Sequence, residues 1–391
     1  MEGTKGWLDD LKLRASYGTQ GNQDVDSYYP AHDLYEIGWD GANLFSSLVY
    51  YGNPDLTWEK QSTFDAGLDF AFLGRIHGSL DYFIRNTDDM LFQRPLAYST
   101  AARPYKWENL GQMRNSGFEF DVTFDIIKNR DLRWSVSLVG AHYKNRIIRL
   151  PEENREDGIT SGMYKLMEGR DRYEYYTYKY AGMVPADEEG AGSAQWYMDV
   201  KDADGNVTAT EKTTEYNKAT KYYLGKSALP DLDGGINTQL YWKGFDFSLQ
   251  TSYRLGGWAY DGEYLDGMSV SFYVGHNKDM WDTFDPVTGK GKYPIWNANN
   301  TSNSYTQTSD VHLVSSSFFN IRNITLGYTL PKDFTRKFYV EGLRFFVMGD
   351  NVALFSARQG FDPRVSFTGA TGSWGGYAPM RTISGGLTLT F

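Results

Sequence analysis

The final stretch of the chain, RTISGGLTLTF at 381–391, carries the pattern that decides the fold. One set of alternate positions is apolar apart from one glycine: Ile383, Gly385, Leu387, Leu389 and Phe391. The other set is small or polar: Thr382, Ser384, Gly386, Thr388 and Thr390. Because successive side chains of a strand point to opposite faces, the stretch predicts a strand with one apolar and one polar face. Such a strand, with an aromatic last residue, is typical of an outer-membrane β-barrel, whose apolar row faces lipid and whose polar row faces the lumen.

The same alternation recurs along the chain. Every second position is predominantly apolar in the segments 11–17, 64–72, 76–84, 118–126, 132–138, 245–253, 324–330 and 343–347. A period of two over so many segments indicates strands and not helices. Soluble β-sandwiches and β-solenoids also alternate, so a soluble β-protein is the structural alternative on the pattern alone.

Two kinds of connection separate these segments. Short turns lie at 73–74, 128–130 and 243–244, and a turn of modest length lies at 331–341. Long stretches lie at about 19–56, 89–112, 147–229, 259–311 and 356–380. Outer-membrane barrels alternate short periplasmic turns with long outer loops. The connections predict roughly ten strands, each near the ~9–11 residues that a tilted spanning strand needs. The strand-like run RYEYYTYKYAGMV at 172–184 does not fit this alternation, and we expect it in the large loop as part of an external hairpin.

The composition limits the class of protein. Phe, Trp and Tyr make up 16% of the 391 residues, which fits aromatic girdles at two membrane interfaces and stacking surfaces in the loops. No apolar run approaches the ~18 residues that a membrane helix needs. The formal net charge of −10, without a basic run, argues against nucleic acid as a partner. The absence of Cys excludes disulfides and thiolate metal sites.

The start of the chain, MEGTKGWLDD, has neither the basic residues nor the apolar stretch of a secretory signal. For an outer-membrane protein, this predicts that residues 1–391 form the carboxy-terminal part of a longer protein. The signal peptide is then expected before Met1.

We find no catalytic constellation in the sequence. The histidines are dispersed and lack both i, i+4 and zinc-ligand spacing: His32, His77, His142, His276 and His312. Neither the phosphate-binding G-x-x-x-x-G-K-[ST] motif nor the G-x-S-x-G nucleophile elbow is present. The sequence therefore predicts a protein without enzymatic activity, metal ion or cofactor.

The stretch DADGNVTATE at 202–211 shares one feature with a calcium loop, the oxygen-bearing Asp202, Asp204 and Asn206 at alternate positions. It departs from that motif at Val207, where the sharp turn needs glycine, and at Thr213, where a bidentate Glu belongs. The alternative is an Asp-Gly turn between two short strands of an outer loop. The sequence leaves both interpretations open.

Eight blocks of sequence run in order nearly from one end of the chain to the other. They are LRASYGTQGNQ (13–23), NPDLTWEKQSTFDAGLDFAFL (53–73), IHGSLDYFIRNTDDML (76–91), NLGQMRNSGFEFDVTF (109–124), SFFNIRNITLGYTLP (317–331), LRFFVMGDNVALF (343–355), FDPRVS (361–366) and APMRTISGGLTLTF (378–391). Together they resemble the carboxy-terminal half of the SusC/RagA-type TonB-linked outer-membrane transporters of Gram-negative bacteria. The resemblance implies an antiparallel transmembrane barrel of about 22 strands, plugged by an amino-terminal domain outside this chain. Residues 1–391 would supply a little under half of its wall.

The resemblance further implies two protein partners. A SusD-like surface lipoprotein forms a lid over the extracellular mouth, and the TonB complex acts through the missing plug. Such pairs capture oligosaccharides or peptides and import them with energy from the proton-motive force. We therefore expect active nutrient import across the outer membrane, with oligosaccharides as the first and peptides as the second candidate cargo. A passive porin or a surface adhesin is the alternative function, and a membrane-embedded hydrolase lacks the clustered residues that it needs.

Carbohydrate capture needs aromatic rings, on which the C–H faces of sugars stack, beside polar groups that pair with hydroxyls. The candidate substrate-binding residues of the long loops are Trp39, Asp40, Trp107, Trp196, Tyr197, Trp258, Asp261, Trp281, Trp296 and Trp374. The alternative for each ring is packing within its own loop or against the lid, because Tyr and Trp are enriched at protein interfaces. We expect a few members of the set to touch cargo.

Overall fold

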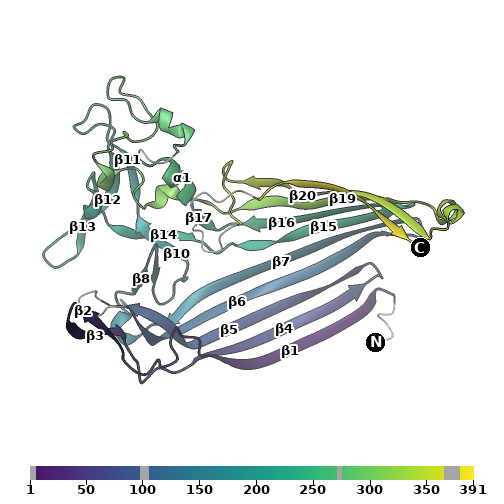
Figure 1. Ribbon diagram of the computed structural model, residues 1–391, viewed down its shortest axis with the longest axis horizontal. Helices are drawn as coiled ribbons and strands as arrows, with labels where there is room; N and C mark the ends of the chain where they lie inside the picture. Colours follow the sequence, from purple (N-terminus) through teal and green to yellow (C-terminus); the bar gives the residue numbers. More distant parts are fainter. Residues whose placement is uncertain (1–5, 97–104, 271–274, 365–378) are drawn as a thin grey trace. The chain divides into compact units, whose positions relative to one another are not determined.

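Long antiparallel strands dominate the computed structural model, which describes residues 6–96, 105–270, 275–364 and 379–391 (Figure 1). The chain forms two compact units. Unit 1 comprises Met1–Phe120, Tyr143–Thr160 and Leu166–Arg172, and unit 2 comprises Asp121–His142, Ser161–Lys165 and Tyr173–Phe391. Two strands, β6 (Tyr105–Lys128) and β7 (Leu132–Arg149), belong in part to each unit.

In unit 1, the strands pair in the order in which the chain forms them. They are β1 (Leu8–Asn22), β4 (Glu59–Phe72), β5 (Ile76–Pro95) and the first part of β6. The register places Leu13 opposite Leu68, which in turn lies opposite Leu80. Because opposite residues share a face of a sheet, the alternation of the sequence becomes a continuous apolar face.

Unit 2 continues the same pairing scheme from the end of β6 through β7. The further strands, in hydrogen-bonded order, are β15 (Leu232–Trp242), β16 (Phe245–Leu255), β19 (Phe318–Thr329), β20 (Gly342–Ser356) and β21 (Thr382–Thr390). One row of facing side chains runs across five strands: Trp134, Leu240, Phe247, Leu326 and Val347. Ten strands of the described residues thus form the main pairing order, which confirms the all-β antiparallel prediction of roughly ten strands.

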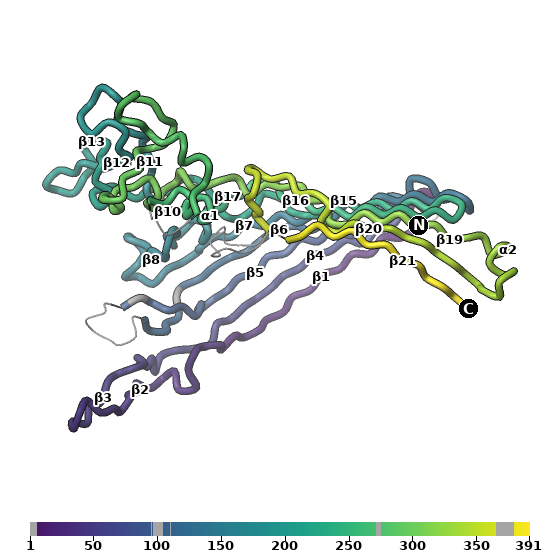
Figure 2. The backbone as a smooth tube through the Cα atoms, turned by 45° about the horizontal axis from the view of Figure 1, so that its top comes forward, coloured from purple at the N-terminus to yellow at the C-terminus, as the bar shows by residue number. Residues whose placement is uncertain are grey.

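The short turns of unit 2 lie at one end of these strands. The amide of Lys243 donates to the Asp131 carbonyl, that of Leu330 to Leu343, and that of Glu341 to Thr390. The β19–β20 connection carries the helix α2 (Lys332–Thr335) and the 3₁₀ turn η7 (Arg336–Phe338). Figures 1 and 2 both show α2 beyond the ends of β19 and β20. The long connections of this unit leave from the opposite ends of the strands.

Two strands are longer than the alternation predicts. The prediction of a loop over 89–112 is wrong for most of its length, because β5 continues to Pro95 and β6 begins at Tyr105. Where both faces of a strand meet polar surroundings, the alternation ends, as it does in NTDDMLFQRP at 86–95, while the hydrogen-bonded ladder continues.

The long connections contain smaller sheets and short helices. Their strands are β2 (Leu34–Asp40), β3 (Asn43–Tyr50), β8 (Ile159–Ser161), β9 (Tyr164–Leu166), β10 (Glu174–Tyr178), β11 (Tyr180–Met183), β12 (Ala194–Lys201), β13 (Val207–Thr213), β14 (Lys221–Ser227), β17 (Trp258–Tyr260) and β18 (Leu313–Ser315). The run 172–184 forms two of them: β10 pairs with β9 and β14, and β11 forms a hairpin with β12. The hairpin prediction therefore holds for the second half of that run.

Buried apolar clusters lie in the connections and not on the apolar face of the main strands. In unit 1, Ile147, Leu150, Ile159 and Leu166 pack together where β7 ends. In unit 2, the main cluster consists of Tyr175, Ala228, Tyr260 and Leu313. The apolar side chains of the main strands are largely exposed, as in Leu13, Leu326, Val347 and Ile383. Among the described residues, no helix has the length and apolar character to cross a membrane.

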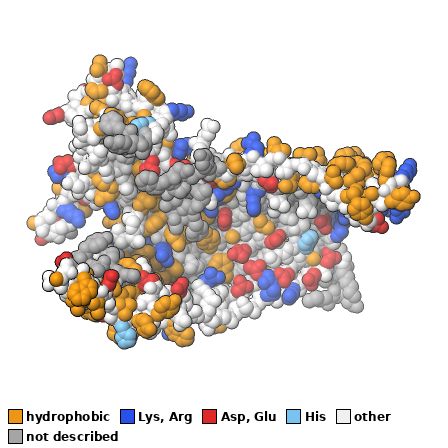
Figure 3. All heavy atoms as spheres, in the orientation of Figure 1, with side chains coloured by type: hydrophobic (Ala, Val, Ile, Leu, Met, Phe, Trp, Pro, Cys, Tyr) orange, Lys and Arg blue, Asp and Glu red, His pale blue; other side chains and the backbone are white. Residues whose placement is uncertain are grey.

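The opposite face of the strands carries ion pairs that pass over glycine. In unit 1, Arg14 on β1 bonds to Asp69 at 3.0 Å and to Asp81 on β5 at 2.7 Å, across Gly67 of β4. In unit 2, Arg344 on β20 bonds to Asp246 on β16 at 2.6 Å, across Gly327 of β19. Acidic and basic side chains gather along the long strands on the face drawn in Figure 3. Alternation therefore sorts apolar from charged residues between the two faces.

Candidate functional site

An exposed apolar hairpin stands out in the connection between β1 and β4. Strands β2 and β3 pair so that Tyr35 lies opposite Leu48, Ile37 opposite Ser46, and Trp39 opposite Leu44. These side chains share one face, on which Tyr35, Ile37, Trp39 and Leu44 are exposed, with Trp39 at 71%. Phe45 covers Gly38 on the other face. An isolated two-stranded hairpin is only marginally stable in water, so this face is suited to packing against a partner.

The neighbouring part of unit 1 is held by polar contacts to the start of β6. The carboxylate of Asp26 accepts hydrogen bonds from the Tyr105 hydroxyl at 2.6 Å and from the Trp107 indole nitrogen at 2.5 Å. Asn109 donates to the carbonyls of Thr57 and Asp89. An open pocket of about 740 Å³ lies beside this region, lined among others by Asp24, Tyr28 and Trp58. The exposed rings of Tyr28 and Trp58 give it a stacking surface.

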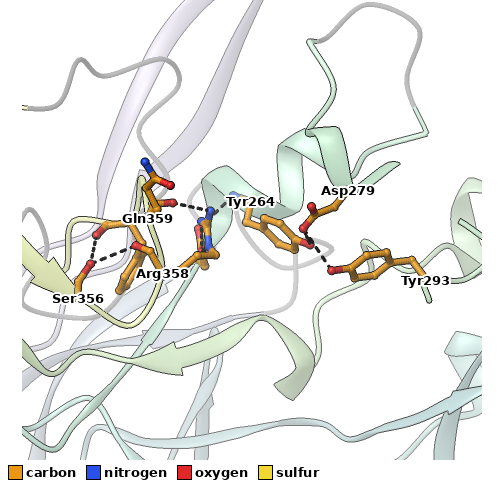
Figure 4. Close-up of polar contacts among 8 residues, drawn as sticks. Tyr264, Asp279, Tyr293, Ser356, Arg358 and Gln359 are labelled. Carbon is orange, nitrogen blue, oxygen red and sulfur yellow. Dashed lines mark hydrogen bonds and ion pairs between the residues drawn. The ribbon is translucent and has the colours of Figure 1, made fainter. Parts of the chain in front are cut away.

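In unit 2, a polar network joins the segment after β17 to the segment after β20 (Figure 4). Asp261 is 1% exposed and precedes the short helix α1 (Gly262–Gly267), where its side chain accepts from the Tyr264 amide at 3.0 Å. The guanidinium of Arg358 forms an ion pair with Asp261 and lies over the Tyr264 ring, 4.7 Å from its centroid. The Tyr264 hydroxyl donates to Asp279 at 2.8 Å, and the Tyr293 hydroxyl donates to the same oxygen at 3.2 Å.

The protonation states of this network follow from burial and hydrogen bonding. The hydrogen bonds from Tyr264 and Tyr293 hold the pKa of Asp279 below its usual value, so its carboxylate is ionised at neutral pH. Burial raises the pKa of Tyr264, and its bond to Asp279 raises it further. The phenol therefore stays neutral and acts as a donor, which describes a positioning network and not a proton-transfer site.

His312 lies among aromatic rings of the same unit. It is 2% exposed, its Nε2 donates to the Tyr305 carbonyl at 3.0 Å, and its ring contacts those of Tyr260 and Tyr305. Burial lowers the pKa of His312 to about 4, and burial raises the pKa values of Tyr260 and Tyr305 to about 12. These groups are therefore uncharged at neutral pH and serve as packing residues.

Beside the network, an open pocket of about 550 Å³ has three arginines in its lining, Arg358, Arg364 and Arg381. Arg364 is paired with Asp362 and donates to Asn351 at 3.1 Å. Arg381 is exposed and directly precedes β21. The pocket can donate hydrogen bonds to hydroxyl or carboxylate groups.

The predicted site residues differ widely in accessibility. Trp281 is 94% exposed, and Trp39 and Asp40 are exposed, whereas Trp196 and Asp261 are buried and cannot reach a ligand in this conformation. Trp196 packs edge-on against Tyr216, which is the alternative of packing within its own loop. The partly buried members are Trp107, Tyr197, Trp258 and Trp296. Trp374 lies outside the described residues.

Lysines cover two of the partly buried rings. The Lys226 ammonium lies 4.0 Å from the centroid of Trp258, and the Lys179 ammonium lies 5.3 Å from that of Tyr197. Those ring faces are occupied by cations of the chain itself. Of the predicted set, Trp39, Asp40 and Trp107 belong to unit 1 and the described others to unit 2.

The stretch 202–211 forms the tight turn between β12 and β13. Asp202 accepts from the amides of Asp204 and Asn206 at 3.0 and 2.8 Å, and Gly205 has a φ of +86°. Its geometry is that of the Asp-Gly turn. No group of three or more His, Cys, Asp or Glu side chains in the described part of the chain is arranged to hold a metal ion.

Some of the site residues were not predictable from local sequence. Arg358 and Asp261 are 97 positions apart, and no motif links them. Asp279 and Tyr293 also lie outside the candidate set, although Asp279 is two residues from the predicted Trp281. Trp58 lies in the block at 53–73, where the neighbouring residues predict the start of a strand and not a binding loop.

Comparison with known proteins identifies the family. The family model for "TonB dependent receptor-like, beta-barrel" matches residues 6–352. TonB-dependent receptor P3 of Formosa agariphila is 27% identical over 97% of the chain, and TonB-dependent receptor SusC of Bacteroides thetaiotaomicron is 26% identical over 92%. A solved structure of the RagAB peptide transporter matches 99% of the chain with a TM-score of 0.82 and 25% identity.

The chain spans only 39% and 35% of the lengths of the two relatives and 41% of the matched RagAB chain. The family model nevertheless matches nearly all of the main strands, from β1 to most of β20. The apolar face fits lipid, which agrees with the outer-membrane location of this family. The chain belongs to the TonB-dependent receptor β-barrel family and is an outer-membrane protein of SusC/RagA type.

Proposed function

We propose that this chain forms part of the wall and mouth of a TonB-dependent importer that moves nutrients across the outer membrane. The observation that carries the proposal is the match to the RagAB transporter over 99% of the chain, with a TM-score of 0.82. In this proposal residues 1–391 are the carboxy-terminal part of the barrel, and the plug and the segment that engages TonB lie in the rest of the protein. The chain itself has no catalytic role and needs no cofactor.

The proposed partner is a SusD-like surface lipoprotein that covers the mouth. The β2–β3 hairpin supports this part of the proposal, because Tyr35, Ile37 and Trp39 form an exposed apolar face in a connection of the kind that faces the exterior. A lid that packs on this face would remove the exposed side chains of Tyr35, Ile37 and Trp39 from water. We therefore assign Trp39 to the lid contact and not to cargo.

Oligosaccharides are the proposed cargo. The exposed ring of Trp281 and the pocket beside Tyr28 and Trp58 offer stacking surfaces, and Asp24 and Asp40 offer hydroxyl partners nearby in sequence. Peptides are the second candidate, because the matched RagAB structure is that of a peptide transporter. Arg381 in the lining of the 550 Å³ pocket favours the same candidate, since a guanidinium group binds carboxylates in a bidentate manner.

Uptake by cells that express the full-length protein and its lipoprotein tests the cargo. Labelled oligosaccharides and labelled peptides of matched size are supplied separately, and each is competed by the unlabelled other class. The Trp281→Ala variant is expected to reduce oligosaccharide uptake several-fold, because the stacking of a sugar ring on the indole is lost. Val287→Ala, in an equally exposed position of the same segment, is expected to leave it unchanged. Uptake of peptides alone would replace the first cargo by the second, and accumulation of neither class would contradict import.

A further inference from the structure

The turn between β19 and β20 is longer than the other turns at the same end of the strands of unit 2. The connections at 129–131 and 243–244 are two or three residues long, whereas 330–341 contains α2 and η7. Its sequence LPKDFTRKFYVE places three aromatic and three basic residues within eight positions, 332–339. In a chain with a formal net charge of −10, this concentration of basic residues is unusual.

The fold of the turn holds these side chains outward. Thr335 is 2% exposed, and its hydroxyl donates to the Lys332 carbonyl at 3.3 Å, which fixes the base of the turn. The rings of Phe334 and Phe338 lie 5.5 Å apart, both exposed, and Tyr339 follows with a φ of +59° and 94% exposure. Within the described residues, these rings are not covered by any other element.

The basic residues frame this aromatic cluster. Lys332, Arg336 and Lys337 are all exposed, and none of them forms an ion pair with another described residue. The acidic residues of the turn are Asp333 and Glu341, and the backbone amide of Glu341 is bonded to the end of β21. The turn therefore combines exposed aromatic rings with an excess of positive charge, and orange and blue side chains gather at this tip in Figure 3.

The lipid-facing surface of the strands leads directly into the turn. Phe345 on β20 lies opposite Leu387 on β21, and Leu343 lies opposite Leu389, close to the Leu330–Leu343 hydrogen bond that begins the turn. Short turns of outer-membrane barrels face the periplasm, where the leaflet consists of phospholipid. Aromatic rings favour the membrane interface, and Lys and Arg near a surface are attracted to anionic headgroups.

We propose that residues 332–339 form a binding site for anionic phospholipid of the periplasmic leaflet. Phe334, Phe338 and Tyr339 insert at the level of the headgroups, while Lys332, Arg336 and Lys337 contact the phosphate groups. The site anchors the β19–β20 end of the protein to the membrane, independently of the cargo. The occupant is a membrane lipid and not a soluble phosphate, because the aromatic rings require an apolar surface.

The test uses the full-length protein, purified in mild detergent and mixed with equal amounts of phosphatidylglycerol and phosphatidylcholine. Native mass spectrometry counts the lipids retained by the wild type and by the variant K332Q/R336Q/K337Q. The wild type is expected to retain phosphatidylglycerol preferentially. Each basic residue contributes about five-fold to the attraction, so removing all three should lower this preference by up to about 100-fold.

The matched control is K201Q/K212Q/K290Q, which removes three exposed lysines from the long connections of the same unit. It should retain the wild-type preference, and the melting temperature of each variant checks that it is folded. A second variant, F334S/F338S, should reduce retention of both lipids, because the apolar contact is lost. Equal lipid retention by the basic variant and the control would overturn the proposal, as would displacement of the lipid by soluble glycerol phosphate at an equal concentration.

Discussion

Gly67 and Gly327 allow the charged face of the sheet to form. An added Cβ at Gly67 would lie 2.7 Å from the Arg14 guanidinium carbon, and one at Gly327 would lie 2.6 Å from both Asp246 carboxylate oxygens. In both places a long cation and a carboxylate from strands on either side meet above the glycine. The same arrangement in each unit indicates that glycine at the central strand is required by side-chain packing and not by backbone conformation.

Gly67→Ala is expected to destabilise the protein by about 1–3 kcal/mol, because Arg14 and Asp81 must move to admit the methyl group. Gly18→Ala is the matched control, since a Cβ at this position on β1 meets nothing within 4 Å. Thermal unfolding of the full-length protein in detergent, followed by the heat-dependent shift in gel mobility, measures the difference. Equal unfolding temperatures for the two variants would show that the ion pair does not need the glycine.

The buried His312 makes the stability of the connection between β17 and β18 in unit 2 depend on pH. Burial lowers the pKa of His312 from 6.5 to about 4, so the unfolded segment binds a proton more readily than the folded one. The contribution of the neutral His312 to the free energy of unfolding is therefore complete above pH 6.5. It decreases as the pH falls toward 4, by up to about 3 kcal/mol. Hydrogen exchange of residues 305–315, corrected for the intrinsic rate, should be faster at pH 5 than at pH 7.

The variant His312→Phe keeps an aromatic ring of similar size and removes the titrating group. Its exchange in the same segment should be independent of pH between 5 and 7. If the variant and the wild type respond equally to acid, another group is responsible.

At the scale of elements, strand prediction succeeded where burial differs between the two faces and failed where it does not. The segments 64–72 and 118–126 alternate strictly, and both lie within observed strands. The ends of β5 and β6 beyond Asn86 and before Phe118 carry polar residues on both faces, so nothing in the sequence distinguishes them from loop. Strands β2 and β3 lie in the stretch predicted as a long connection, about 19–56, and their pairing depends on the register of the hairpin.

The β2–β3 hairpin is expected to determine binding of the lid lipoprotein. Ile37→Asp places a charge in the centre of its apolar face and should reduce co-purification of the lipoprotein at least about ten-fold, because a buried unpaired charge is costly. Val287→Asp, at an exposed position of a unit 2 connection, is the matched control and should have no effect. Full recovery of the lipoprotein with the Ile37 variant would assign the lid contact to other segments.

At the scale of the whole molecule, the sequence predicted the class of fold and the family but not the arrangement of the candidate site. Repeated alternation and the ordered blocks are properties of local sequence, and they were sufficient for the antiparallel sheet and the SusC/RagA resemblance. The contact between Asp261 and Arg358 joins two long connections and depends on how each connection folds. For the same reason, burial of Trp196 could not be distinguished from exposure of Trp281.

Residues 1–391 expressed alone should not form a soluble monomer. Within the described residues, β1 pairs only with β4 and β21 only with β20, and the apolar face of the strands is exposed. Unpaired sheet edges and an apolar surface promote aggregation in water. Sedimentation without detergent should find the fragment aggregated, and a cooperatively melting soluble monomer would contradict the membrane-facing assignment of that surface.

Dependence of uptake on TonB tests the central claim, active import, most directly. Cells that express the full-length protein and its lipoprotein are compared with an otherwise identical strain that lacks TonB, with the same labelled cargo and the same amount of receptor in the membrane. Accumulation is expected only in the strain with TonB, and it should stop when the proton-motive force is collapsed. Equal accumulation in both strains would contradict active import and indicate a passive porin.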